Sequence, residues 1–443
     1  MITFLNHACV KINHNNINLI MDPYISGSAF NNGWNLITEE NHEKELEEIS
    51  HIWFSHEHPD HFSVNFLKSI PEDKRNDITI LFQFTLDKRV ISFCKKLGFK
   101  TFELKEGSDH YLEKDFKIIC GKIPYYDSWL YIEYGGKRII NCNDCILENP
   151  NAVMNVKRYI AHVDILLTQF SYANWYGNEE DKSLRSFLAN EKLDRIKLQS
   201  DAFKAKFIIP FASFIFFSHE ENFYMNEEIN NLDIVNEYVT NNCRAYPIIL
   251  KPNERWDGFT KKDNKISLEY WRHKYSLINE KKLNTSEIAH KPEEIINRSK
   301  KFIERIKQKN NMFLVRLLEI IGIIKPVIFL ISDQNVQMRF TWKNGLQIEK
   351  KLTDISNRIE LHSESVVFLF DYDFGLDTLN VNARFNSSVK TKRNMIRTFF
   401  IPSLNNTGRY FTVRSLLTSM NINFIINGLK TVGLIKKRDI ELE

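Results

Sequence analysis

The chain has 443 residues, too many for one typical domain, and this length predicts two or three domains. Its formal net charge is only +4, so the composition does not indicate a nucleic-acid-binding protein. The six cysteines are scattered and do not look like a disulfide framework, and no basic leader precedes the strand-like run at residues 2–5. We therefore expect a protein of the reducing cytoplasm.

In the first half of the chain, strand patterns alternate with helix patterns. The predicted strands are 2–5, 10–12, 17–21, 51–54, 78–82, 116–120, 128–134, 138–141 and 164–168. The predicted helices are 39–50, 62–69, 86–97 and 152–160. Hairpins occur among these strands, as at Gly135-Gly136. The pattern therefore predicts a layered α/β sandwich more than a doubly wound parallel sheet.

The second half begins with a polar, charged stretch at 261–291, which suggests a connector. An amphipathic helix follows at 294–308, with one apolar face formed by Ile295, Ser299, Phe302, Ile303 and Ile306. Strands are predicted at 327–331, 337–341 and 366–370. We expect three regions: a catalytic domain at 1–255, a helical connector at 256–293 and a smaller α+β accessory domain at 294–443.

The most apolar stretch of the chain, residues 311–332, is interrupted by Arg316, Glu319, Lys325 and Pro326. A buried helix followed by a strand explains such a stretch better than a membrane span does. We therefore expect no membrane association.

A short histidine-rich run carries the clearest chemistry. His56, His58, Asp60 and His61 follow the buried strand at 51–54 in the form H-x-H-x-D-H. Two imidazoles at positions i and i+2 can converge on one metal ion, and the carboxylate and imidazole beyond them can bind a second. Histidine and aspartate ligands leave positions open for water or substrate, as catalytic sites require. So dense a run is improbable as a chance surface cluster.

This run resembles the signature of the metallo-β-lactamase superfamily, and other segments match that family in order. They are residues 6–10 with 21–23, 135–144, 211–213 and 218–222. The runs at 26–30 and 126–130, together with Asp144-Cys145, are similar to the lactamase-fold part of CMP-N-acetylneuraminate hydroxylase. The resemblance covers roughly the first 250 residues. It implies an αββα metallo-β-lactamase sandwich followed by a smaller C-terminal α+β domain.

The resemblance also implies roles for individual residues. His56 and His58 would bind the first metal, and Asp60, His61 and His219 the second. Asp144 would bridge the two ions. His7 and Asp22 are candidates for orienting the ligands from behind, because a ligand histidine is usually held through its other ring nitrogen.

One departure from the family pattern concerns the third ligand of the first metal. The family usually has a histidine just before the strand that begins here at Ser128, whereas this chain has the segment 124–127. Asp127 could take that place, which would favour iron or manganese over zinc. Two alternatives are that the first metal is weakly held or that His110 supplies the ligand.

Three functions are compatible with these residues. The first is a hydrolase of esters, thioesters, amides or phosphodiesters, in which two divalent ions (iron or zinc, or manganese) activate water and Asp60 orients it. The second is a di-iron oxygenase or hydroxylase acting on a nucleotide sugar or related small molecule. The third is a non-catalytic binding protein, which the complete ligand run argues against.

The oxygenase hypothesis has a further requirement. The hydroxylase that the chain resembles also carries a Rieske iron–sulfur domain, and the paired cysteine and histidine runs of such a domain do not occur in this sequence. Electrons would then have to come from a separate donor protein. The C-terminal region could serve as a lid, as a substrate-selecting module or as the surface of a homodimer.

Overall fold

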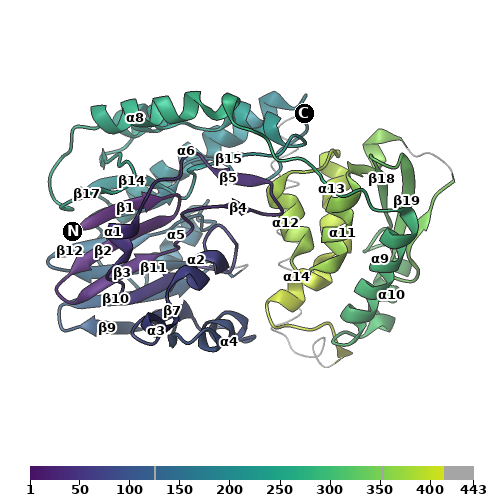
Figure 1. Ribbon diagram of the computed structural model, residues 1–443, viewed down its shortest axis with the longest axis horizontal. Coiled ribbons are helices and arrows are strands. Elements are labelled where there is room, and N and C mark those ends of the chain that lie inside the picture. Colours follow the sequence, from purple (N-terminus) through teal and green to yellow (C-terminus); the bar gives the residue numbers. More distant parts are fainter. Residues whose placement is uncertain (124–125, 351–353, 414–443) are drawn as a thin grey trace. The chain divides into compact units, whose positions relative to one another are not determined.

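The computed structural model describes residues 1–123, 126–350 and 354–413. The chain forms two compact units (Figure 1). Unit 1 comprises Met1–Ala173, Lys182–His219 and Phe223–Leu283. Unit 2 comprises Asn174–Asp181, Glu220–Asn222 and the chain from Asn284 onward. The predicted domain boundaries stay predictions, and the last part of the predicted accessory domain, 414–443, lies outside the described residues.

Two seven-stranded sheets form the centre of unit 1. The first runs in the order β17 (Glu254–Trp256), β1 (Ile2–Asn6), β2 (Cys9–His14), β3 (Ile17–Met21), β6 (His51–Phe54), β7 (Thr79–Gln83), β8 (Lys100–Leu104). The second runs in the order β16 (Tyr246–Pro247), β14 (Phe207–Phe211), β13 (Ile165–Gln169), β12 (Lys137–Asn141), β11 (Ser128–Tyr134), β10 (Phe116–Lys122), β9 (Asp109–Glu113). Both combine antiparallel hairpins with parallel pairs, as the mixed sequence pattern predicts.

Alternating side chains of the first sheet enter two different hydrophobic cores. On β6, Ile52 and Phe54 pack with residues of α2 (Val64–Ser69) and α4 (Arg89–Lys96) in an outer core. Trp53, between them, belongs to the larger core shared with the second sheet. This division follows from the two-residue period of a strand, and it explains why the predicted strand at 51–54 contains no polar face.

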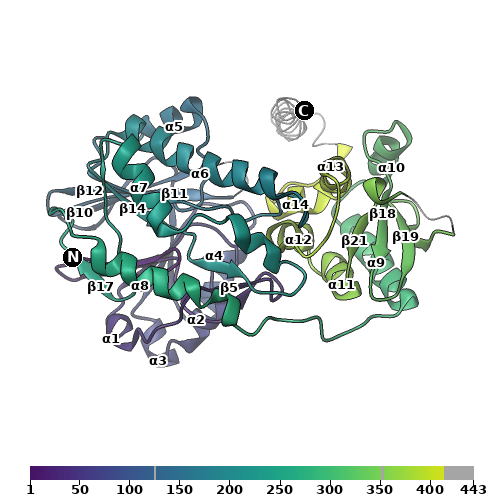
Figure 2. The ribbon, with the colours of Figure 1, turned by 90° about the horizontal axis from the view of Figure 1, so that it is seen from above.

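Helices cover the outer face of the second sheet as well. They are α5 (Pro150–Lys157), α6 (Lys182–Phe203) and α7 (Leu232–Asn242), which contribute buried residues to the same core as β13 and β14. In Figure 2 these helices lie on one side of the strands of unit 1, and α1 (Glu43–Leu46), α2 and α3 (Glu72–Arg75) lie on the other. The layers are therefore helix, sheet, sheet and helix, which confirms the predicted αββα sandwich.

Unit 1 also contains a small sheet, formed by β4 (Ser28–Ala29), β5 (Trp34–Leu36) and β15 (Ile215–Phe217). Its other elements are the longer helix α8 (Lys265–Ser276) and the 3-10 helices η1 (Phe223–Glu228) and η2 (Ile278–Glu280). The helix predicted at 39–50 is wrong in extent, because only α1 is helical there. Before it, Asn41 accepts a hydrogen bond from the backbone of Glu43, and such local side-chain bonds compete with helix formation.

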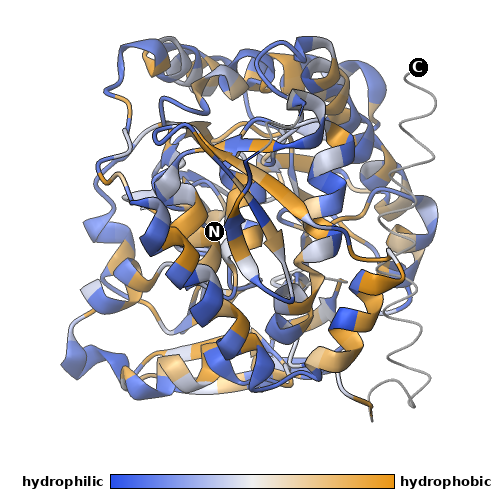
Figure 3. Ribbon diagram, turned by 90° about the vertical axis from the view of Figure 1, so that its right-hand side faces the viewer, coloured by the Kyte–Doolittle hydropathy of each residue, from blue (hydrophilic) through white to orange (hydrophobic). Residues whose placement is uncertain are grey.

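Unit 2 is an α+β structure, as predicted. Its sheet has the order β20 (Gly345–Ile348), β19 (Val336–Thr341), β18 (Val327–Ile331), β21 (Ile359–Leu361). Its helices are α9 (Pro292–Lys307), α10 (Met312–Ile320), α11 (Ser363–Asp371), α12 (Gly375–Asn382), α13 (Val389–Thr398) and α14 (Phe400–Asn406). The predicted face of α9 is confirmed, since all five of its residues are buried. Figure 3 shows hydrophobic and hydrophilic residues mixed along the helices on the side facing the viewer.

The strand predicted at 366–370 is wrong, because this segment lies in α11. The His362 ring accepts a hydrogen bond from the backbone of Glu364 and so caps the helix start. The side chains of 365–367 and 369–370 are all buried. A short run that is apolar on every side has neither a helical nor a strand period. The β-branched valines, which favour strands, therefore led to the wrong prediction.

Helix α10 corrects a further expectation, that of a buried helix. The stretch 311–332 does hold a helix and a strand, but Val315 is the one buried residue of this helix, and Phe313, Leu317 and Ile320 are exposed. No helix among the described residues is long and apolar enough to cross a membrane.

An aromatic cluster in unit 2 gives a prediction about stability. The Phe302 ring lies 5.4 to 6.4 Å from the rings of Phe340, Trp342, Phe370 and Phe399. Phe302→Ala should lower the free energy of unfolding by about 3–5 kcal/mol, because it leaves a cavity in this core. Phe313→Ala, at a 75% exposed position, should change it by less than about 0.5 kcal/mol. Urea unfolding of the full chain measures both, and equal losses would contradict the assignment of this core.

Candidate metal centre

The histidine-rich run leaves the carboxyl end of β6, a central strand with parallel neighbours on both sides. At its start, the backbone N–H of Ser55 donates to Oδ1 of Asp22 at 2.7 Å. At its end, the Ser63 hydroxyl caps α2 by accepting a hydrogen bond from the N–H of Phe66. The run is therefore fixed at both ends, and its side chains are held at the edge of the sheet formed by the carboxyl ends of the parallel strands.

The structure forms one group of ligand atoms from His7, Asp60 and His61, which all lie within 4.8 Å of one another. Oδ2 of Asp60 is 3.3 Å from Nε2 of His7 and 3.5 Å from Nε2 of His61. His7 comes from the turn after β1, where its backbone φ is 38°. From the sequence we predicted only an orienting role for His7. This turn lies next to the histidine-rich run because of sheet packing, which sequence spacing does not reveal.

A second group consists of His56, His58 and Asp144, again within 4.8 Å. Nε2 of His56 lies 3.0 Å from Nδ1 of His58 and 3.7 Å from Oδ2 of Asp144. The same Asp144 oxygen lies 3.6 Å from Nε2 of His61 in the first group. Asp144 thus faces both groups, which is the position that a carboxylate bridging two ions requires.

The electrostatics of the two groups differ. Burial, helped by the neighbouring His61 and His58, holds the pKa of His56 well below its usual range, so its ring is neutral and can offer a lone pair to a metal. Burial by itself would also lower the pKa of His61, but the carboxylates of Asp144, Asp60 and Asp22 raise it to about 10. These carboxylates therefore favour a positive charge at His61.

Several buried polar atoms of the two groups fit bound metal ions. Oδ1 of Asp60, Oδ1 of Asp144 and Nε2 of His61 are buried and have no hydrogen-bond partner among the described residues. Leaving such atoms unpaired costs free energy, and bound cations would remove that cost. Although burial raises the pKa of Asp60, the charges of His61 and His7 lower it below its usual range, so this carboxylate is ionised. A buried set of imidazole and ionised carboxylate groups fits divalent metals. An ion bound there would supply the positive charge that the carboxylates otherwise favour at His61.

Asp22 supports this set from behind. Its Oδ2 lies 3.0 Å from Nδ1 of His61, while its Oδ1 holds the backbone of Ser55. With Nδ1 occupied in this way, the Nε2 atom of His61 faces Asp60 and Asp144. This is the orienting contact that the sequence predicted for Asp22.

Three other predicted positions lie outside the two groups. Asp127 is buried, and burial together with the charge of Asp144 raises the pKa of its carboxyl well above the usual range. It precedes β11, and residues 124 and 125 beside it lie outside the described residues. His219 is fully buried at the end of one segment of unit 1. His110 lies on β9, with its ring 5.3 Å from that of Phe102. The ligand roles of Asp127 and His219 stay predictions.

The residues that follow His219 belong to unit 2. Glu221 pairs there with Arg384 at 2.7 Å, and the side-chain amide of Asn222 donates to the backbone oxygen of Asn382 at 2.6 Å. Arg384 is itself fully buried. The segment directly after a predicted ligand is therefore fixed by a charged and a polar contact within unit 2.

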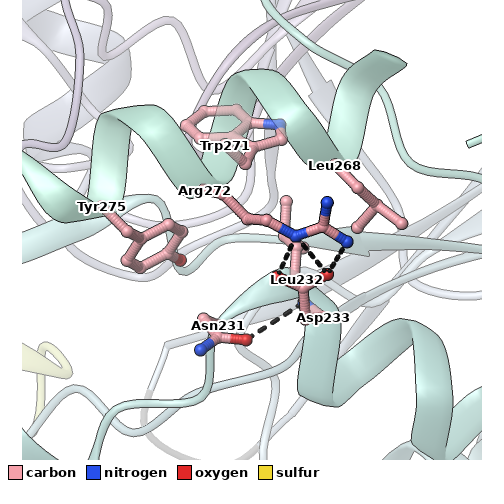
Figure 4. A pocket seen from close by; sticks show the side chains of 7 residues that line it. All are labelled: Asn231, Leu232, Asp233, Leu268, Trp271, Arg272 and Tyr275. Carbon is pink, nitrogen blue, oxygen red and sulfur yellow. Dashed lines mark hydrogen bonds and ion pairs between the residues drawn. The ribbon is translucent and has the colours of Figure 1, made fainter. Parts of the chain in front are cut away.

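A separate pocket in unit 1 lies between α7 and α8 (Figure 4). Its lining comprises Asn231, Leu232, Asp233, Leu268, Trp271, Arg272 and Tyr275. The guanidinium of Arg272 donates to both carboxylate oxygens of Asp233, at 2.7 to 3.0 Å. These charges satisfy each other, and none of the lining residues belongs to the two ligand groups, so the pocket does not compete as the candidate site.

Comparison with known proteins agrees with this geometry. The model of the family "Beta-lactamase superfamily domain" matches residues 1–184. The N-terminal region is a beta-lactamase superfamily domain. This match confirms the superfamily that the histidine-rich run predicted. The chain is therefore a homologue of metallo-β-lactamase-fold enzymes.

The curated relatives include two cytidine monophosphate-N-acetylneuraminic acid hydroxylases. That of Danio rerio is 26% identical over 264 residues, covering 55% of this chain and 43% of the relative. That of Xenopus laevis is 28% identical over 244 residues, covering 51% and 40%. The matched part thus spans less than half the length of these relatives.

Solved structures are more distant. CmlA, a diiron beta-hydroxylase from Streptomyces venezuelae, is similar with a TM-score of 0.41 and 15% identity, covering 56% of this chain and 52% of that one. A possible metal-dependent hydrolase from Veillonella parvula gives 0.42 and 14%, covering 57% and 97%. Likenesses at this level carry no argument about function.

The Asp22–His61 contact gives a prediction about metal affinity. Asp22→Asn removes the charge that orients His61 and should weaken the binding of one metal ion by about 10- to 100-fold. Asp115→Asn is a matched control, because Asp115 also pairs with a histidine, His14, at 2.6 Å, but lies exposed. Competition with a coloured chelator measures both affinities. Unchanged affinity in Asp22→Asn would show that this carboxylate has no role in holding the metal ligand.

Proposed function

We propose that this chain is a metal-dependent hydrolase with a dinuclear centre, acting on an ester, thioester, amide or phosphodiester. The single observation that supports this most is the pair of ligand groups joined through Asp144, which faces His56 in one group and His61 in the other. Two ions a few ångströms apart are typical of enzymes that hydrolyse such bonds.

The proposed ligands extend the two groups. The first ion would be held by His56 and His58, and the second by Asp60, His61 and His219, with Asp144 between them. Asp127 would complete the set of ligands around the first ion. We assign His7 one of two roles, binding the second ion or holding the Asp60 carboxylate in place, since its Nε2 lies 3.3 Å from Oδ2 of Asp60.

When bound, such ions supply Lewis acidity and lower the pKa of a water molecule so that it is a nucleophile near neutral pH. The chain's own residues provide the setting. Asp60 is ionised because His61 and His7 stand beside it, and it can accept a hydrogen bond from the attacking water. Asp22 and the Ser55 backbone keep the His61 ring in one orientation.

A second candidate is an iron-dependent hydroxylation of a nucleotide sugar or related small molecule. It is supported by the curated relatives, which are named as hydroxylases of cytidine monophosphate-N-acetylneuraminic acid. It requires iron, oxygen and a separate electron donor. Oxygen uptake that depends on a reductant would favour it, and product release without oxygen would favour hydrolysis. The identity of the metal ions, a cytoplasmic location and a homodimer remain predictions.

The proposal predicts the behaviour of a ligand variant. His58→Ala should remove at least one of the two ions and lower turnover of a hydrolysed substrate more than about 100-fold, with the far-UV circular dichroism unchanged. His162→Ala, at an exposed histidine of unit 1, should keep both ions and the activity. Elemental mass spectrometry and a panel of esters, thioesters, amides and phosphodiesters give the readouts. Full metal content in His58→Ala would overturn the ligand assignment.

A further inference from the structure

Two basic side chains of α6 are buried close to each other. Lys192 is 9% exposed and Arg195 is 4% exposed. Nη2 of Arg195 donates to the Gln169 side chain, and Nη1 lies 3.8 Å from the partly exposed carboxylate of Glu148. Nε and Nη1 of Arg195 have no hydrogen-bond partner among the described residues. This guanidinium therefore has buried donors left over.

This basic pair is connected to the candidate metal centre through Gln169. Arg195 binds the side chain of Gln169, whose backbone N–H donates to the oxygen of Asn143 at 2.9 Å. Asn143 directly precedes Asp144, the residue that faces both ligand groups. The charge of Lys192 interacts with Asp144, and that of Arg195 with Asp127. The basic pair and the metal ligands thus belong to one region of unit 1.

Two like charges buried together need a compensating negative charge. None of the ion pairs formed by the described residues includes Lys192. Burial, with Arg195 adding to it, lowers the pKa of Lys192 to about 7, and the attraction of Glu148 and Asp144 does not restore it. Asp144 is also the carboxylate that metal ions would neutralise. The carboxylates of the protein therefore do not hold Lys192 in its charged form, and the donors of Arg195 are not all used, so an added anion would stabilise both side chains.

We infer that Lys192 and Arg195 form a binding site for an anionic oxygen group of the substrate, a carboxylate or a phosphate, next to the metal centre. Arginine offers such groups directed N–H donors and lysine offers a point charge. This inference rests on the proposed function, because the anionic group would belong to the substrate of that reaction. It narrows the substrate to molecules that carry a negative charge near the bond that reacts.

The test is calorimetric titration of the metal-loaded full chain with inorganic phosphate and with acetate. Lys192→Met and Arg195→Gln should each weaken binding of the preferred anion about tenfold or more. Lys197→Met is the matched control on the same helix, because Lys197 is exposed and pairs with Asp201 at 2.6 Å, and it should bind as the wild type does. Tighter binding of phosphate would assign a phosphate to the site, and tighter binding of acetate a carboxylate.

Thermal unfolding gives an independent readout. Lys192→Met should raise the Tm in anion-free buffer, because it removes a poorly compensated buried charge, and phosphate should raise the Tm of the wild type more than that of the variant. Equal anion affinity in wild type and both variants would overturn the inference, as would a wild type that binds neither anion. Metal content is measured on the same samples, so loss of metal in the wild type would instead count against the proposed function.

Discussion

Burial of charge in the loop after β6 is the constraint on which the rest of unit 1 depends. Asp60 and His61 are almost completely removed from water, and His56 with them. An isolated buried charge is very costly, so these groups are stable only where opposite charges meet at short range. The loop contributes one buried carboxylate, Asp60, and Asp22 and Asp144 come from other parts of the chain. Those parts must therefore be brought to the loop by the fold.

The sandwich achieves this through its strand order. Asp22 follows β3, which lies beside β6 in the first sheet, and Asp144 follows β12, a central strand of the second sheet. The turn between β1 and β2 adds His7. Side chains from both sheets therefore meet at one place, and the alternating burial of residues such as Trp53 and Phe54 fixes the register that aims them there.

The sequence predicted much of this, and its failures have physical causes. The histidine-rich run consists of neighbouring residues, so metal binding could be predicted from it without a structure. The amphipathic face of α9 was also predicted correctly. Val366–Phe370 was misjudged because a helix buried on most sides loses its period. The pairing of His7 with Asp60 and the burial of Lys192 near Asp144 arise from tertiary packing, and neither leaves a pattern along the chain.

Unit 2 contains an ion pair of its own between the buried Arg384 and Glu221. It holds two short segments that interrupt the sequence of unit 1, 174–181 and 220–222. One of them begins directly after His219. Unit 2 therefore includes two segments whose neighbours along the chain on both sides belong to unit 1.

The most direct test of the account is to count the metal ions per chain in protein purified without added metal and without oxygen. Elemental mass spectrometry should find about two divalent ions per chain, as a dinuclear centre requires. Zinc would agree with the proposed hydrolase, and iron would direct attention to the hydroxylation alternative. A chain that holds no ion, and takes none up when zinc, iron or manganese is supplied, would contradict the central claim.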